Sequence, residues 1–325
     1  MGNLGFINIP HPSYDMGNNP NILTTFDPDI GYVHTPNWHL THNRNCMSLS
    51  YDYNSLGFLD IDHTKTSDKK RLVLLGDSFT EGFGVHVGER VSDLLQEESG
   101  NPTINMGISG IGTTQEMEVY RKYRNNFDHS AILIGIYPEN DFYDNSFEIT
   151  ETHQRPYWIK YDGVWCLEPT LNYSDRPTYP WFKKFLKECT YLYNAYLSVK
   201  NAYKWGPVDY EEVLGHYNYS EDDWKRLELS LREIKNLAGD KPMAIYTIPS
   251  KNEAFTMALS DNPLILQLKE LCDELEIELL DVTSQIGELS IPERKKLYNS
   301  CESHWSAKGH AFATTLIYNS WDYFH

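Results

Sequence analysis

Short apolar segments that stop at polar or glycine-containing turns restrict the fold of this chain more than any other feature. They cover residues 71–75, 103–106, 131–137, 242–248 and 277–280. Continuous apolar runs of this length are typical of parallel strands buried on both faces, and such strands need a crossover of a dozen or more residues between them. The pattern therefore predicts an α/β fold with three layers, in which helices cover both faces of an open parallel sheet.

Stretches with helical spacing fill the intervals between the strands. Helices are expected over about 89–99, from Thr113 onward, over about 221–238 and 262–275, and from 306 to about 318. The segment before the first strand, residues 1–69, is rich in Pro, Asn, His and Tyr without a sustained period. We expect an irregular N-terminal segment that packs on the α/β domain of residues 70–325.

An aromatic-rich insertion at about 143–220 interrupts the alternation between the third and fourth strands. Tyr and Trp are abundant in the chain, with 23 and 8 copies, and many of them lie in this insertion. Aromatic side chains at such positions either form core or cover a ligand site as a cap. The sequence leaves both interpretations open.

Charge and cysteine usage restrict the partners and the compartment. Lys and Arg number 28 against 46 Asp and Glu, a net charge of −18, which disfavours nucleic acid, anionic lipid and polyanionic substrates. No apolar run reaches the roughly 18 residues of a membrane span, and residues 1–20 lack the regions of an export signal. The cysteines are odd in number and never in C-x-x-C spacing, which predicts free thiols in a reducing compartment. They are Cys46, Cys166, Cys189, Cys272 and Cys301. We therefore expect a cytoplasmic protein; its oligomeric state is not specified by the sequence.

Candidate catalytic residues follow the predicted strands. Ligands of open parallel sheets bind at the carboxyl ends of the strands, where Ser78, Gly110 and Asn140 come after the first, second and third strands. A serine hydroxyl needs a base to become a nucleophile. His304 precedes the last helix, and Glu302, two residues earlier, can accept its second ring N–H. These residues predict a Ser-His-acid triad.

An oxyanion that forms when Ser78 attacks a carbonyl needs fixed hydrogen-bond donors. The backbone N–H groups of Ser78 and Gly110 and the side-chain amide of Asn140 are expected to supply them. Asp77 and Phe79 flank the serine, and Trp305 follows the candidate base, so we expect all three near the substrate.

Several neighbouring polar residues have structural interpretations instead. Asp77 and Asp141 are expected to hydrogen-bond loop backbone, and His310, in the last helix, is expected to be a structural histidine. His34, His39 and His42 invite a metal-site interpretation, but no cluster of Cys or carboxylates accompanies them at ligand spacing, so we expect neither a metal nor another cofactor.

Four sequence blocks in order resemble the SGNH (GDSL-type) hydrolases, which are named for these positions. The blocks are Gly76-Asp77-Ser78, Asn105-Met-Gly-Ile-Ser-Gly110, Pro138-Glu-Asn140-Asp141 and Glu302-Ser-His304-Trp-Ser-Ala-Lys-Gly-His310. The residues 26–32 and 54–57 are similar to segments often seen ahead of the first block in bacterial members. The resemblance implies a flavodoxin-like parallel sheet and a serine hydrolase that uses the four blocks together.

The last block departs from the family pattern in two places. The family usually has Asp, often three residues before the histidine and sometimes two, where this chain has Glu302. Ser306 stands where relatives often carry Asn. Glutamate serves equally as an orienting carboxylate, and Asp281, after the last strand, is an alternative acid.

The function that these residues favour is a serine esterase or deacylase acting through an acyl-enzyme intermediate. The resemblance implies a small-molecule or carbohydrate ester, such as an acetylated sugar or a short acyl ester, as substrate. One alternative is an O-acyltransferase with the same triad, in which a hydroxyl acceptor replaces water. Another is a non-catalytic binding module, which predicts that His304 does not reach Ser78.

Overall fold

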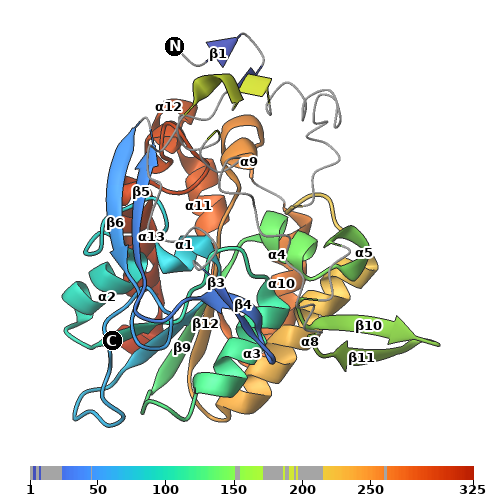
Figure 1. The fold of residues 1–325 in the computed structure, drawn as a ribbon. Coiled ribbons are helices and arrows are strands. Elements are labelled where there is room, and N and C mark those ends of the chain that lie inside the picture. Colours follow the sequence, from blue (N-terminus) through green and yellow to red (C-terminus); the bar gives the residue numbers. More distant parts are fainter. Residues whose placement is uncertain are drawn as a thin grey trace.

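A parallel sheet of five strands forms the centre of the molecule, as the computed structural model shows (Figure 1). The structure describes residues 24–44, 46–150, 154–170, 215–259 and 262–325, and the short pieces 3–4, 7–8, 186, 190–193 and 195–196. The strands are β7 (Leu72–Leu75), β8 (Thr103–Asn105), β9 (Ala131–Ile136), β12 (Met243–Thr247) and β13 (Glu278–Leu280). Their spatial order is β13-β12-β9-β7-β8, the flavodoxin-like order predicted from the resemblance.

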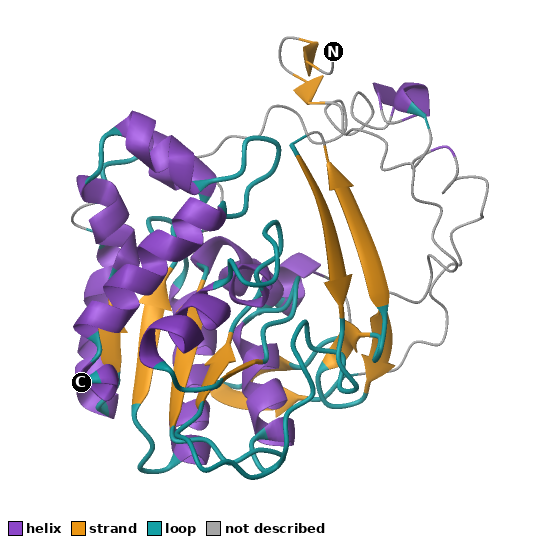
Figure 2. Ribbon diagram, turned by 90° about the vertical axis from the view of Figure 1, so that its left-hand side faces the viewer, coloured by secondary structure: helices purple, strands orange, loops and turns teal. Residues whose placement is uncertain are grey.

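Helices cover both faces of this sheet, which confirms the three-layer α/β prediction (Figure 2). Side chains alternate between the faces along each strand. Val73 and Leu75 pack in one core with α3 (Thr113–Tyr123), α8 (Glu221–Ala238) and α10 (Pro263–Leu275), whereas Leu72 and Leu74 pack in the other with α2 (Val91–Ser99) and α13 (Ala307–Ser320). The predicted strands and long helices agree with these bounds to within about two residues at most ends.

Short helices occupy the loops at the carboxyl ends of the strands. They are α1 (Ser78–Glu81), α4 (Pro138–Asp144), α5 (Phe147–Thr150), α9 (Lys251–Thr256), α11 (Val282–Glu288) and α12 (Ile291–Arg294). Two 3-10 turns, η1 (Lys295–Leu297) and η2 (Asp322–Phe324), complete the C-terminal part. α1 and α4 directly follow β7 and β9, so they lie where the strand order reverses and where such sheets bind ligands.

The N-terminal segment contains antiparallel hairpins, so the expectation of an irregular segment is wrong for residues 24–52. The strands are β3 (Thr24–Asp27) with β4 (Gly31–His34), and β5 (His39–Arg44) with β6 (Met47–Asp52); β1 (Asn3–Leu4) and β2 (Ile7–Asn8) form a further short pair. Hairpin β3–β4 packs on α3, where Gln115 Nε2 donates to the carbonyl of Ile30 at 2.7 Å. Strands of only four to six residues leave a weak periodic signal, so no strands were expected in this segment.

A disulfide between Cys46 and Cys301 joins the turn of hairpin β5–β6 to the loop before α13. The expectation of free thiols is therefore wrong for these two cysteines, whereas Cys166 and Cys272 are free and Cys189 lies outside the described residues. Scattered cysteines 255 positions apart carry no pairing signal until the fold brings them together. Disulfides are typical of oxidising compartments, so the thiol argument for a cytoplasmic location no longer holds. In the part of the chain that the structure describes, no helix combines the length and apolarity of a membrane span.

The described part of the aromatic insertion includes a hairpin, β10 (Tyr157–Tyr161) with β11 (Val164–Glu168). It packs against α8: Trp158 Nε1 donates to Ser230 Oγ at 3.1 Å, and Arg226 Nε donates to the Trp158 carbonyl at 3.3 Å. Residues 171–185 and 197–214 of the insertion lie outside the described residues. A cap over the site stays a prediction.

Candidate active site

Ser78 is the first residue of α1, immediately beyond β7. Gly76 makes the turn possible: its φ is +153°, and a Cβ there would meet Thr80 Oγ1 at 2.0 Å. The Asp77 carboxylate caps α1 by accepting from the Phe79 N–H at 2.9 Å, the expected bond to loop backbone. The strand end and the capped turn fix the serine at the sheet edge with 8% of its surface exposed.

His304 reaches Ser78 from the loop before α13. Its Nε2 lies 2.8 Å from Ser78 Oγ, a hydrogen-bond distance. The ring packs between Phe79 and Phe83, with centroid distances of 5.1 and 5.3 Å. The other ring nitrogen, Nδ1, faces Glu302 Oε2 at 3.5 Å. Residues 226 positions apart in the chain thus form a serine, imidazole and carboxylate array.

The Glu302 carboxylate is held in its place by its own loop. Its Oε1 accepts from Asn299 Nδ2 at 3.0 Å, and Lys251 Nζ donates to the carbonyls of Asn299 and Glu302 at 2.6 and 2.8 Å. Gly84 provides the space, because a Cβ there would lie 2.1 Å from Oε1. The alternative acid, Asp281, caps α11 through the Ser284 N–H, and among the described residues Glu302 is the carboxylate paired with His304.

Glu302 is ionised in this environment. Burial acts to raise its pKa, but favourable interactions with the nearby imidazoles of His304 and His42 outweigh burial and lower the pKa to about 2. A carboxylate that stays charged can stabilise an imidazolium on His304.

The residues predicted for the oxyanion hole lie in α1 (Ser78), in the loop after β8 (Gly110) and in α4 (Asn140). Gly110 is exposed with φ +78°, and no atom lies within 4 Å of the position that a Cβ would take. Asn140 Nδ2 donates to Asp77 Oδ2 at 3.2 Å, which places the amide beside the residue before Ser78. The contribution of these donors to an oxyanion hole stays a prediction.

The loop that carries Gly110 is held by Glu81, a residue that the sequence did not single out. Its Oε2 accepts from the Ser109 N–H at 2.6 Å and from the Ser109 hydroxyl, while Oε1 accepts from Tyr53 at 3.0 Å and pairs with His34 at 3.2 Å. The pKa of Glu81 is lowered because these partners outweigh its burial. The N-terminal segment thus supports the second block through Glu81.

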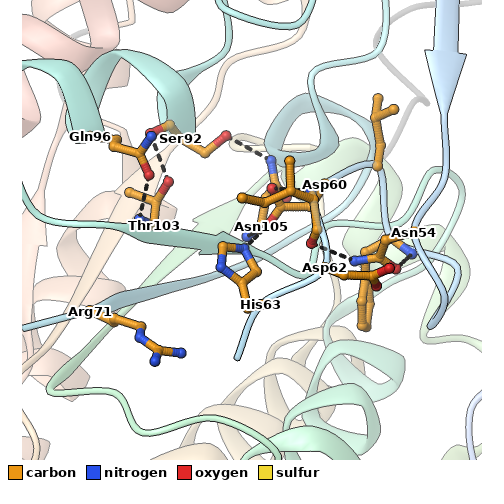
Figure 3. Close-up of polar contacts among 12 residues, drawn as sticks. Asn54, Asp60, Asp62, His63, Arg71, Ser92, Gln96, Thr103 and Asn105 are labelled. Atoms are coloured by element: carbon orange, nitrogen blue, oxygen red, sulfur yellow. Dashed lines mark hydrogen bonds and ion pairs between the residues drawn. The ribbon is translucent and has the colours of Figure 1, made fainter. Parts of the chain in front are cut away.

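Asn105, which opens the second block, is held from both sides (Figure 3). Its Oδ1 accepts from the Gly107 N–H at 2.9 Å, and its Nδ2 donates to the Thr80 carbonyl at 2.8 Å. Its backbone N–H donates to Asp60 Oδ2 at 2.8 Å, and the same oxygen bonds to His63 Nε2 at 2.9 Å. Asn105 therefore acts as a structural junction between the first two blocks and the N-terminal segment.

The expectation that Trp305, Asp77 and Phe79 contact substrate is not met by their positions, because their exposed surface is at most 1%. Trp305 forms a β-bridge with Tyr298, and successive side chains of extended backbone point to opposite sides. His304 therefore faces the site while the indole faces the core, 5.4 Å from the Phe79 ring between centroids. All three support the site from beneath.

Three carboxyl groups are buried beneath the serine. Burial and the nearby Asp141 raise the pKa of Asp77 to about 7, and burial raises the pKa values of Asp141 and Glu116. Asp141 has the structural role expected, accepting from the Tyr137 N–H and the Thr113 hydroxyl at 2.8 and 2.6 Å. His310 is also fully buried, and burial lowers its pKa to about 3, so it is a neutral imidazole in the core.

The three N-terminal histidines face three different carboxylates. His34 pairs with Glu81, His39 with Asp52 at 2.7 Å, and His42 Nε2 lies 3.9 Å from Glu302 Oε2. Within the described ranges no group of three or more His, Cys, Asp or Glu side chains is arranged so that it could hold a metal ion. The sequence missed the place of His42 beside the candidate triad, because only the docking of hairpin β5–β6 on the loop of Glu302 brings it there.

No protein-family model matches the sequence, and no curated protein matches it. Similar solved structures include a member of the lipolytic protein G-D-S-L family from Veillonella parvula, with 13% identity over 78% of this chain and 98% of that chain and a TM-score of 0.42. TesA shares 9% identity over 79% of this chain and 100% of the TesA chain, with a TM-score of 0.45. The psychrotrophic esterase EstA from Pseudoalteromonas sp. shares 11% identity over 77% of this chain and 96% of the EstA chain, with a TM-score of 0.40.

The chain resembles the SGNH (GDSL-type) hydrolases. The resemblance lies in the four blocks, which the structure brings to one edge of the sheet through Ser78, the Gly110 loop, Asn140 and His304. Because the TM-scores of the similar structures lie below 0.5, the interpretation of the site rests on the contacts of this chain's own residues.

Proposed function

We propose that this protein is a serine esterase or deacylase of the SGNH type. The observation that carries the proposal is the 2.8 Å contact between Ser78 Oγ and His304 Nε2, with the ionised Glu302 on the opposite ring nitrogen. This array provides a nucleophile, a base and a group that stabilises the protonated base. A non-catalytic module predicts that the histidine does not reach the serine, so the contact weighs against that alternative.

The proposed reaction proceeds in two halves. Ser78 Oγ attacks the ester carbonyl, its proton passes to His304 Nε2, and the charge on the carbonyl oxygen is stabilised by donors from Ser78, Gly110 and Asn140. The tetrahedral intermediate breaks its bond to the alcohol, which leaves with the proton from His304. Water then attacks the acyl-enzyme with His304 as base, and the carboxylic acid departs while Ser78 regains its proton.

The proposed substrate is a small-molecule or carbohydrate ester with a short acyl group, and the chemistry needs no metal or cofactor. An acyltransferase would differ only in the second half, where an acceptor hydroxyl replaces water. The net charge of −18 makes nucleic acid and anionic surfaces unfavourable partners.

Hydrolysis of p-nitrophenyl acetate, together with labelling by a fluorophosphonate probe, tests the proposal. We expect turnover and a label on the peptide that contains Ser78, and loss of both in Ser78→Ala. Ser67→Ala, at an exposed serine outside the site, is the matched control and should behave as the wild type. A folded wild type without turnover or label would overturn the proposal. Acyl transfer to added sugar hydroxyls in preference to water would favour the acyltransferase.

A further inference from the structure

Glu302 faces two histidines on the same carboxylate oxygen. Oε2 lies 3.5 Å from His304 Nδ1 and 3.9 Å from His42 Nε2, and the histidines come from opposite ends of the chain. The three side chains are 10 to 18% exposed, and both facing nitrogens are buried without a hydrogen-bond partner in this conformation. Hydrogen bonds to oxygen span roughly 2.7 to 3.2 Å, so in this conformation Oε2 has two ring nitrogens close by and is hydrogen-bonded to neither.

Aromatic packing sets the position of His42. Its ring contacts Phe83 with a centroid distance of 4.5 Å, and the Phe83 ring contacts His304 at 5.3 Å. Phe83 therefore packs against both imidazoles. His42 also occupies a defined place in hairpin β5–β6, where it pairs with Leu49.

The hairpin itself is fixed at two points, one on the loop that carries Glu302 and one on the loop after α1. The disulfide joins Cys46, in the turn after β5, to Cys301, the residue before Glu302. On β6, the Tyr51 hydroxyl accepts from the Gly84 N–H at 2.8 Å, at the glycine that leaves room for the carboxylate. Both ends of the contact between His42 and Glu302 are thereby held.

We propose that His42 is a positioning residue that holds the Glu302 carboxylate in line with His304. The inference rests on the proposed esterase function. Asn299 Nδ2 holds Oε1, Lys251 Nζ holds the backbone of the loop, and His42 limits rotation of Oε2 away from His304. Without His42, Oε2 has room to turn, and the imidazolium that forms during the reaction loses part of its stabilisation.

Three variants test this role with p-nitrophenyl acetate as the probe. His42→Leu removes the ring nitrogens, whereas His42→Gln retains an N–H donor. We expect His42→Leu to lower kcat about tenfold with KM nearly unchanged, an effect of the size that is usual when one of two contacting residues is removed. His42→Gln should recover most of the lost kcat. His39→Leu is the matched control, since His39 lies on the same strand and pairs with the exposed Asp52. It should keep wild-type kcat.

A double-mutant cycle separates positioning from general support of the fold. Because His42 acts through the carboxylate, adding His42→Leu to Glu302→Gln should change kcat by less than about twofold. Equal losses with and without the carboxylate would overturn the inference, as would a His42→Leu variant with wild-type kcat. In both of these outcomes the wild type still turns over the ester. Failure of the proposed function gives a different result, namely a wild type with neither turnover nor a label at Ser78.

Discussion

The buried carboxyl beside the nucleophile makes the folding stability depend on pH. Asp77 is 1% exposed, and burial followed by repulsion from Asp141 raises its pKa from 3.8 to about 7. The unfolded chain therefore loses this proton near pH 4, whereas the folded protein keeps it until about pH 7. Since the folded state binds more protons over this interval, the free energy of unfolding falls as pH rises through it and is constant above.

The magnitude follows from the size of the shift. One pKa unit corresponds to ~1.36 kcal/mol, so the ionisation of Asp77 costs about 2 kcal/mol of stability at pH 5 and about 4 kcal/mol above pH 7. Asp77→Asn resembles the protonated acid and can still accept from the Phe79 N–H as the helix cap. Any altered contact with Asn140 is the same at both pH values. Relative to wild type, the free energy of unfolding of the variant should therefore rise by roughly 2–3 kcal/mol between pH 5 and pH 8.

Urea unfolding at pH 5 and pH 8, followed by tryptophan fluorescence, measures this difference. Asp240→Asn is the control, because Asp240 is exposed in the turn between α8 and β12, at the opposite end of the sheet. It should follow the wild type at both pH values. If the stabilities of Asp77→Asn and wild type change in parallel between the two pH values, the reasoning about a neutral buried acid is refuted.

Three further predictions concern Gly84, Glu302 and the disulfide between Cys46 and Cys301. Gly84→Ala places a methyl group 2.1 Å from Glu302 Oε1 and should lower both kcat and the free energy of unfolding, the latter by about 1–3 kcal/mol. Gly88→Ala is the control, because Gly88 has a similar φ of +98° but open space around it, and this variant should keep kcat. Glu302→Gln should lower kcat by about 10³-fold or more at pH 7. The pKa of Glu302 is about 2, so the stability that its charge contributes is present above about pH 4.5 and is lost as pH falls towards 2. The difference between the urea midpoints of wild type and Glu302→Gln should therefore be smaller at pH 3 than at pH 5. Replacing Cys46 and Cys301 together by Ser should lower stability by about 2–4 kcal/mol in thermal unfolding, and an unchanged Tm would contradict a formed disulfide.

The sequence revealed the parts of the site that strand ends determine. Apolar runs stop where β7 and β9 stop, so Ser78 and Asn140 follow directly from the pattern, and His304 follows from its place before the last helix. The direction of a neighbouring side chain is a different problem. Trp305 adjoins His304 in sequence, but the β-bridge to Tyr298 turns it into the core.

The contributions of the N-terminal segment could not be predicted, because they arise from tertiary docking. One local signal was present: Met47, Leu49 and Tyr51 alternate with polar residues, the period of a strand with one buried face. Nothing local indicates that the turn of this hairpin contacts the loop of Glu302. The disulfide and the contact of His42 depend on that docking.

The order of the elements along the chain also affects when the site is completed during synthesis. All strands of the central sheet are complete at Leu280, whereas Glu302, His304 and α13 follow. A ribosome thus releases the serine and the entire sheet before it releases the base. Contacts across 226 and 255 residues are formed late, since distant segments must meet to make them. A nascent chain therefore holds Ser78 without its partner His304 until the segment before α13 has emerged, and the proposed esterase activity requires both residues.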